Sequence, residues 1–204
     1  MMRRFVFTLL AGLVVLVCAP SFSGITSAAE FTADSIQKQQ DMEMKGKIYV
    51  KGEKMRIDMT KAGEKTTTIN RIDKKIIWII NHGDKMYMEM PAMIETLQAS
   101  KIDLDLTKIA DRKKVGTEKV NGYKCDKYLI TYKDKSMGTM TQWISTKLDY
   151  PIKMVYHSSY GDMYTEYKNI KEGRIKDSVF EIPKGYKKMT MPGMGGQMPR
   201  MPQQ

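Results

Sequence analysis

Apolar and polar side chains alternate over several short stretches of the chain. In residues 54–60, 85–90 and 150–156 every second side chain is apolar, and most of the intervening ones are polar. Successive side chains of a β-strand point to opposite faces, so a period of two predicts strands with one apolar face. The alternation alone does not tell which face of each strand would be concave in a curved sheet.

Turn residues separate these stretches at fairly regular intervals. Gly, Asn and Asp, often next to Lys or Glu, gather at 51–53, 62–64, 73–75, 81–84, 121–122, 138, 160–162 and 172–173. Strand-length segments separated by turn signals about 8–12 residues apart are typical of antiparallel β-structure. We therefore expect an antiparallel meander.

Two segments depart from simple alternation. Residues 76–80 read IIWII, which is apolar on both sides and predicts a central strand covered on both faces. In residues 91–110, Pro91 suits the first turn of a helix, and Met93, Ile94 and Leu97 have helical spacing. We expect one or two short helices there, covering the apolar face of the sheet.

The first 29 residues have the layout of a secretory signal. A basic start, MMRR, precedes an apolar run from Phe5 to Cys18, and the small residues Ser27, Ala28 and Ala29 follow. We expect export across the inner membrane to the periplasm and a mature chain that starts near Glu30. Lipidation of Cys18 is the alternative, although the bulky residues before Cys18 do not favour it.

The remaining chain divides into one domain and a tail. Residues 30–188 have the length of a single domain. Residues 189–204 are rich in Met, Pro and Gly, a composition that cannot form a packed core and predicts disorder. Removal of the signal takes away two arginines and no acidic residue, so the net charge falls from +11 to +9. The lysines are spread over turns and polar strand faces, which indicates solvation of the surface, and the expected export argues against a nucleic-acid partner.

No catalytic or cofactor motif stands out. Cys125 is the single cysteine after the signal, so we expect a buried thiol and no intramolecular disulfide. His82 lies in a turn and His157 ends a strand, with no nucleophile motif beside either. The sequence has no zinc, calcium or phosphate-binding spacing. We expect a binding protein and no enzyme, with no cofactor and no metal site built from these residues.

Methionine is the unusual component of the chain. Of its 19 methionines, 17 follow Met1 and Met2, and five of these fall in the tail. Methionine side chains are flexible and polarizable, so a surface rich in them adapts to ligands of varied shape, such as acyl chains. Thioethers are also soft ligands for Cu(I), and the tail has Met-x-Met and Met-x-x-Met pairs. A lipid site in the domain and a copper site in the tail are therefore both open.

Four segments together resemble outer-membrane lipoprotein carriers of the LolA/LolB type. They read GKIYVKGEKMRID (46–58), RIDKKIIWIIN (71–81), QWISTKLDYPIKM (142–154) and DSVFEIPKGY (177–186). The likeness spans residues 41–188 and is strongest to a group of secreted bacterial relatives that share YMEMP (87–91) and VNGYKC (120–125). It implies a mainly β fold: an unclosed antiparallel half-barrel of about 10 strands, with one or two short helices plugging its concave face. In the carriers that cavity holds lipoprotein acyl chains.

These observations predict a monomeric periplasmic protein that holds an apolar or lipid ligand in a half-barrel cavity. Its partners would be lipid or lipoprotein acyl chains, in lipoprotein or envelope lipid handling. A methionine-rich copper-binding protein and an envelope stress or scaffold module that binds proteins are the alternatives. The residues predicted to line the cavity are Met55, Ile57, Met59, Trp78, Met86, Met88, Met90, Trp143 and Met154.

Overall fold

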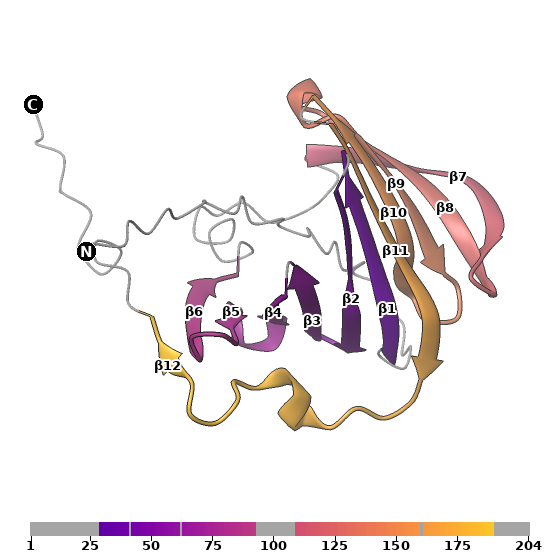
Figure 1. Ribbon diagram of the computed structural model, residues 1–204. Coiled ribbons are helices and arrows are strands. Elements are labelled where there is room, and N and C mark those ends of the chain that lie inside the picture. The colour runs from indigo at the N-terminus through magenta and orange to yellow at the C-terminus, as the bar shows by residue number, and fades with distance from the viewer. Residues whose placement is uncertain (1–28, 41, 62, 93–108, 160, 190–204) are drawn as a thin grey trace, which may run out of the picture.

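The computed structural model describes residues 29–40, 42–61, 63–92, 109–159 and 161–189, and these form one large β-sheet (Figure 1). All strand pairs are antiparallel except the short β12–β6 pair. The strands are β1 (Glu30–Gln39), β2 (Met42–Lys51), β3 (Lys54–Lys61), β4 (Glu64–Arg71), β5 (Ile76–Asn81), β6 (Met86–Pro91), β7 (Ala110–Val120), β8 (Tyr123–Tyr132), β9 (Thr139–Ser145), β10 (Tyr150–Ser158), β11 (Gly161–Glu172) and β12 (Lys187–Lys188). Three short 3-10 helices are η1 (Ile72–Lys74), η2 (Lys135–Met137) and η3 (Asp177–Phe180).

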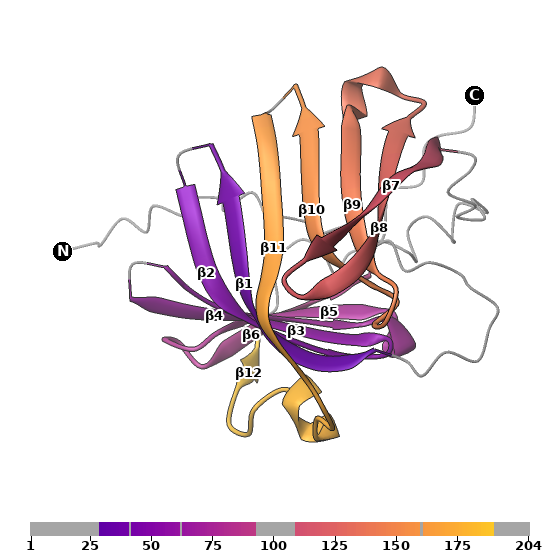
Figure 2. The same ribbon diagram turned by 90° about the vertical axis from the view of Figure 1, so that its right-hand side faces the viewer.

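The sheet is built from two meanders joined side by side. Its strand order is β12-β6-β5-β4-β3-β2-β1-β11-β10-β9-β8-β7, so the first meander meets the second through the β1–β11 pair. The sheet curves strongly, and β3–β6 run across the lower end of the upright strands β8–β11 (Figure 2). The two ends of the sheet do not pair with each other. The expected unclosed half-barrel is confirmed, with 12 strands in the described residues where about 10 were expected.

Local sequence accounts for the strands and their turns. The alternating segments at 54–60, 85–90 and 150–156 fall within or next to β3, β6 and β10. Asn121 and Gly122, predicted as a turn, join β7 to β8 with φ angles of 48° and 88°. Positive φ at both central residues defines the two-residue turn that best matches the twist of paired strands.

The expected position of residues 76–80 is wrong in one respect. They form β5, but β5 lies third from the end of the sheet and has only one fully buried face. Trp78 and Ile80 are buried, whereas Ile77 and Ile79 are half-buried. A run of apolar side chains predicts a strand well, but it does not require a second packed layer when one face belongs to a concave apolar surface.

Three other expectations fall wholly or partly on residues outside the described part of the chain. The secretory signal expected in residues 1–29 lies outside the described residues, apart from Ala29. The helical region expected at 91–110 is described only at its ends, where Pro91 closes β6 and Ala110 opens β7. The tail is described only at Met189, whose backbone N–H donates to the carbonyl of Tyr87 at 2.7 Å.

The C-terminal segment, residues 173–189, packs against one face of the first meander. Figures 1 and 2 show it along the side of β3–β6 that faces away from β7–β11. We call this side the outer face and the opposite side the concave face. On the outer face Phe180 and Ile175 pack against Ile69, Trp78 and Ile80 in one buried apolar cluster. The segment therefore covers apolar positions that the sheet alone would leave exposed.

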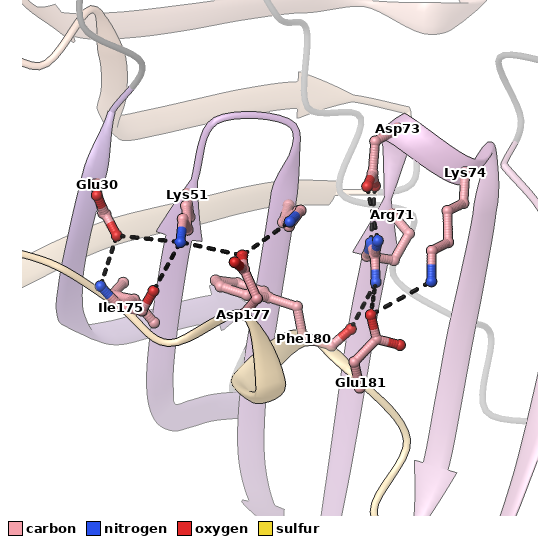
Figure 3. Close-up of polar contacts among 10 residues, drawn as sticks. Glu30, Lys51, Arg71, Asp73, Lys74, Ile175, Asp177, Phe180 and Glu181 are labelled. Carbon is pink, nitrogen blue, oxygen red and sulfur yellow. Dashed lines mark hydrogen bonds and ion pairs between the residues drawn. The ribbon is translucent and has the colours of Figure 1, made fainter.

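Ion pairs fasten this segment to the sheet (Figure 3). Arg71 is 4% exposed; it pairs with Asp73 at 2.7 Å and with Glu181, and it donates to the Phe180 carbonyl at 3.2 Å. Its hydrogen bonds to Asp73 raise the pKa of the guanidinium, and its bonds to Glu181 act in the same direction. A buried charge is tolerated only when its hydrogen-bonding groups find partners, and Arg71 meets that condition.

A second set of ion pairs lies nearer the start of the segment. Lys51 and Lys54 both reach Asp177, at 3.1 and 2.9 Å, and Lys51 also donates to the carbonyl of Ile175 at 2.9 Å. The bonds from the two lysines lower the pKa of Asp177 to about 2. The motif DSVFEIPKGY, which carried the sequence resemblance, is thus the part of the chain that binds the outer face.

Candidate functional site: the concave face

Three rows of side chains run across β1–β6 on the concave face. In an antiparallel sheet, directly opposed residues point to the same face, so the register assigns each row. We call these rows the concave ladders. They read Ser35–Gly46–Met59–Thr66–Asn81–Met86, Ala33–Ile48–Ile57–Thr68–Ile79–Met88 and Phe31–Val50–Met55–Asn70–Ile77–Met90.

The concave ladders bring six of the predicted ligand-binding residues together on one surface. Met55 and Ile57 are each 5% exposed and belong to the main buried cluster. Met59, Met86, Met88 and Met90 are half-buried. The surface therefore runs from a packed apolar centre on β1–β3 to a more accessible methionine strip on β6.

Met154 lies on the same face, beyond the junction of the two meanders. A further row runs Gln37–Thr165–Met154–Gln142, and Gln37 is two residues along β1 from Ser35. Residues two apart on a strand share a face. Met154 is 9% exposed and belongs to the same buried cluster as Met55 and Ile57.

The register places the two tryptophans of the predicted set on the opposite face. Trp78 is paired with Ile69 and Glu89, and its Nε1–H donates to Glu89 Oε2 at 2.9 Å. It packs under the C-terminal segment, so it is a structural residue of the outer face. The sequence does not indicate which face Trp78 points to, because both sides of the IIWII strand are apolar.

Trp143 is 6% exposed and belongs to the same buried cluster as Met154, but register gives its side chain the opposite direction. It is opposed by Lys127 and Lys153, whereas its neighbour Gln142 is opposed by Met154. The ammonium groups of Lys127 and Lys153 lie 4.8 and 4.4 Å from the centre of the indole ring. Cations over an aromatic face are attracted to its π-electrons, which explains the position of these lysines.

Polar atoms without partners are the feature of this face that sequence reasoning missed. Four buried side-chain atoms of the described residues lack any hydrogen bond, and three are on the concave face: Ser35 Oγ, Asn70 Oδ1 and Tyr167 OH. The alternation of residues 31–37 contained the signal, because it places Ser35 in line with Phe31 and Ala33. Buried polar groups are nearly always satisfied, so these three require an explanation.

The concave ladders carry no formal charge. None of their positions is Lys, Arg, His, Asp or Glu. Burial raises the pKa of the nearby Tyr167 and Tyr150 phenols, so both stay neutral at physiological pH. The concave ladders can therefore hold apolar groups and offer neutral hydrogen bonds, but they have no charge to neutralise an ionic ligand.

Outside this face, the cysteine and the two histidines of the described residues have the following contacts. Cys125 is fully buried, as expected, and burial raises the pKa of its thiol. His82 contacts Thr67 and Tyr186, and His157 pairs with Asp162 at 2.9 Å. The described residues contain no group of three His, Cys, Asp or Glu side chains arranged to hold a metal ion, and no helix long and apolar enough to cross a membrane. The methionines 191–201 of the predicted copper site lie outside those residues.

An open, strongly curved antiparallel sheet with an apolar concave face defines the LolA-like half-barrel class, as the sequence resemblance predicted. The chain belongs to the family described as a domain of unknown function, DUF4412, which matches residues 33–150. No curated protein matches the chain.

Solved structures give the fold further support. An uncharacterized conserved protein from Thermus thermophilus superposes with a TM-score of 0.58 at 13% identity, covering 79% of this chain and 90% of that one. MucB of Pseudomonas aeruginosa, solved with MucA, gives 0.53 at 12% identity, covering 76% and 56%. The chain thus spans little more than half of MucB.

Proposed function

We propose that the protein is a non-enzymatic periplasmic binding protein that holds an apolar or acyl-chain ligand against its concave face. One observation carries the proposal. Seven of the nine predicted ligand-binding residues share one face of the sheet, six of them in the uncharged concave ladders, and four half-buried methionines form its accessible part.

The chemistry of this face suits a hydrocarbon ligand. Each methylene group removed from water contributes about 0.8 kcal/mol, so a long acyl chain gains affinity from burial alone. Methionine thioethers are flexible enough to follow chains of different length and unsaturation. Register directs both tryptophans away from this face, and methionines line its accessible strip on β6.

The comparisons support a binding role outside the cytoplasm. LolA-type carriers, which the sequence resembles, hold lipoprotein acyl chains in the same kind of half-barrel. MucB, which shares the fold, was crystallised in complex with MucA(peri). A protein partner is therefore the second candidate function, and the secretory signal expected in residues 1–29 agrees with either role.

The test begins with the mature protein purified from its own envelope. Native mass spectrometry and lipid extraction identify co-purifying ligands, and a fluorescent fatty-acid probe measures affinity. We expect Met88→Asp to weaken probe binding at least tenfold, because a carboxylate next to hydrocarbon is desolvated without a partner. Met137→Asp is the matched control, since Met137 is 39% exposed and lies in η2, outside the sheet.

The outcomes separate the proposals. Co-purifying lipid and selective loss of probe binding in Met88→Asp support the acyl-chain function. A stoichiometric protein partner without lipid supports the second candidate. Equal probe affinity in the intact protein, Met88→Asp and Met137→Asp contradicts binding at the concave face.

A further inference from the structure

We propose that the hydroxyl groups of Ser35 and Tyr167 form a polar anchor on the concave face, which binds the neutral carbonyl of an acyl ester or amide. The inference rests on the proposed function and makes its ligand class specific. The ligand would be an esterified or amide-linked acyl chain, with its hydrocarbon along the methionines and its carbonyl at this pair.

The two hydroxyls come from the strands that join the meanders. Ser35 on β1 is directly opposed by Tyr167 on β11. Side chains opposed in this way stand about 5 Å apart at Cβ and share a face, so both hydroxyls belong to the same side of the sheet. The Ser35 position is also the first member of the concave ladder that ends at Met86.

Neither hydroxyl has a partner among the described residues. Both side chains are 0% exposed, and neither Ser35 Oγ nor Tyr167 OH makes a hydrogen bond there. Tyr167 belongs to the main buried cluster, and its ring centre lies 6.4 Å from that of Tyr150. A phenylalanine would pack there without an orphaned polar atom, so packing alone does not explain the hydroxyl.

The chemistry of the pair selects a neutral acceptor. Both groups are hydroxyls that can donate, and a carbonyl oxygen has two lone pairs to accept both bonds. A free carboxylate would bring a charge that no residue of the concave ladders can neutralise. Burial raises the pKa of Tyr167 and keeps its proton in place as the donor.

The experiment compares three fluorescent probes that share one label and chain length: a methyl ester, an alkane and a free fatty acid, all at pH 8. For the intact mature protein we expect the ester to bind about tenfold more tightly than the alkane, the effect of one to two net hydrogen bonds. The carboxylate should bind more weakly than the ester.

The variants are Ser35→Ala, Tyr167→Phe and their combination. We expect the double variant to bind ester and alkane equally, with its alkane affinity unchanged. Its melting temperature without ligand should be equal to or above that of the parent, because an unsatisfied buried group is removed. Tyr164→Phe is the matched control: it removes a hydroxyl from the opposite face of β11, where Tyr164 OH donates to Glu166 at 2.6 Å.

Each result has one meaning. Equal binding of ester and alkane by the intact protein overturns the anchor and leaves the proposed function standing. If the intact protein binds neither the ester nor the alkane, both the anchor and the proposed function are overturned. Loss of ester and alkane affinity together, with a lowered melting temperature, shows that the two hydroxyls are structural and overturns the anchor.

Discussion

Trp78 shows how one side chain can connect three parts of the sheet. Its indole N–H donates to Glu89, and Glu89 accepts from Lys188 on β12 at 2.6 Å. Lys74 and Arg71 lie over the ring at 5.5 and 6.0 Å from its centre. A large aromatic body is buried while its polar end is satisfied, which is the arrangement that makes tryptophan a strong anchor.

We expect Trp78→Ala to lower the free energy of unfolding by about 3–5 kcal/mol, the range for large aromatic side chains removed from a core. Urea denaturation followed by circular dichroism measures it. Trp78→Phe is the control that keeps most of the packing and removes the hydrogen bond, and we expect it to cost about 1 kcal/mol. A loss below about 1 kcal/mol for Trp78→Ala would mean that Trp78 contributes little to the outer-face cluster.

At the scale of elements, a hydrogen-bonded chain connects β3, β4, the β5–β6 turn and the C-terminal segment. Thr67 Oγ1 donates to Asp58 Oδ1 at 2.6 Å, so it is free to accept from His82 Nε2–H at 2.8 Å. His82 Nδ1 then accepts from Tyr186 OH at 2.7 Å. This series of hydrogen bonds uses the neutral ring of His82, with Nε2–H as donor and Nδ1 as acceptor; a protonated ring would require the Tyr186 hydroxyl to turn and accept instead.

This arrangement predicts a loss of stability in mild acid. Burial lowers the pKa of His82 from 6.5, Lys65 and Arg56 lower it further, and Asp58 opposes them. The unfolded state therefore takes up a proton first, and stability present above about pH 6.5 is lost as pH falls through the folded-state pKa. Melting temperatures between about pH 7.5 and 5 measure the loss.

The control variants separate His82 from other groups. His82→Gln should flatten the pH dependence in this window, while His157→Gln, at an exposed site beside Asp162, should retain it. Asp177 titrates in a lower window, because Lys54 and Lys51 lower the pKa of its carboxyl to about 2. If the melting temperature of His82→Gln falls with pH as steeply as that of the parent, the assignment of the pH effect to His82 is wrong.

Across the whole molecule, the sequence indicates the alternation within each strand but not the contacts between segments that are distant in the sequence. Period-two alternation predicted β3, β6 and β10 because each strand has one face in a packed or concave surface. The same alternation put the methionines within β3 on one side of that strand, and those within β6 on one side of theirs. It failed for Trp78 and Trp143, whose positions depend on the C-terminal segment and on lysines of neighbouring strands. Contacts between segments about a hundred residues apart leave no periodic signal in either one.

The end of the chain provides the last test. Mature protein ending at Met189 keeps β12, the Lys188–Glu89 ion pair and the backbone bond from Met189 to Tyr87. We expect it to match the full chain in fatty-acid probe affinity and melting temperature, since the concave face is untouched. Protein ending at Gly185 loses Tyr186 and β12, so we expect a lower melting temperature from the uncovered β6 edge.

A Cu(I) competition assay on the same two truncations addresses the copper alternative. If the tail methionines bind Cu(I), the full chain should hold copper and the protein ending at Met189 should not, while its probe affinity stays the same. If that truncated protein instead loses the fatty-acid probe, the concave face alone does not make the site. Lipid binding would then depend on residues 190–204, and the proposal that places it on β1–β6 and β10 would be wrong.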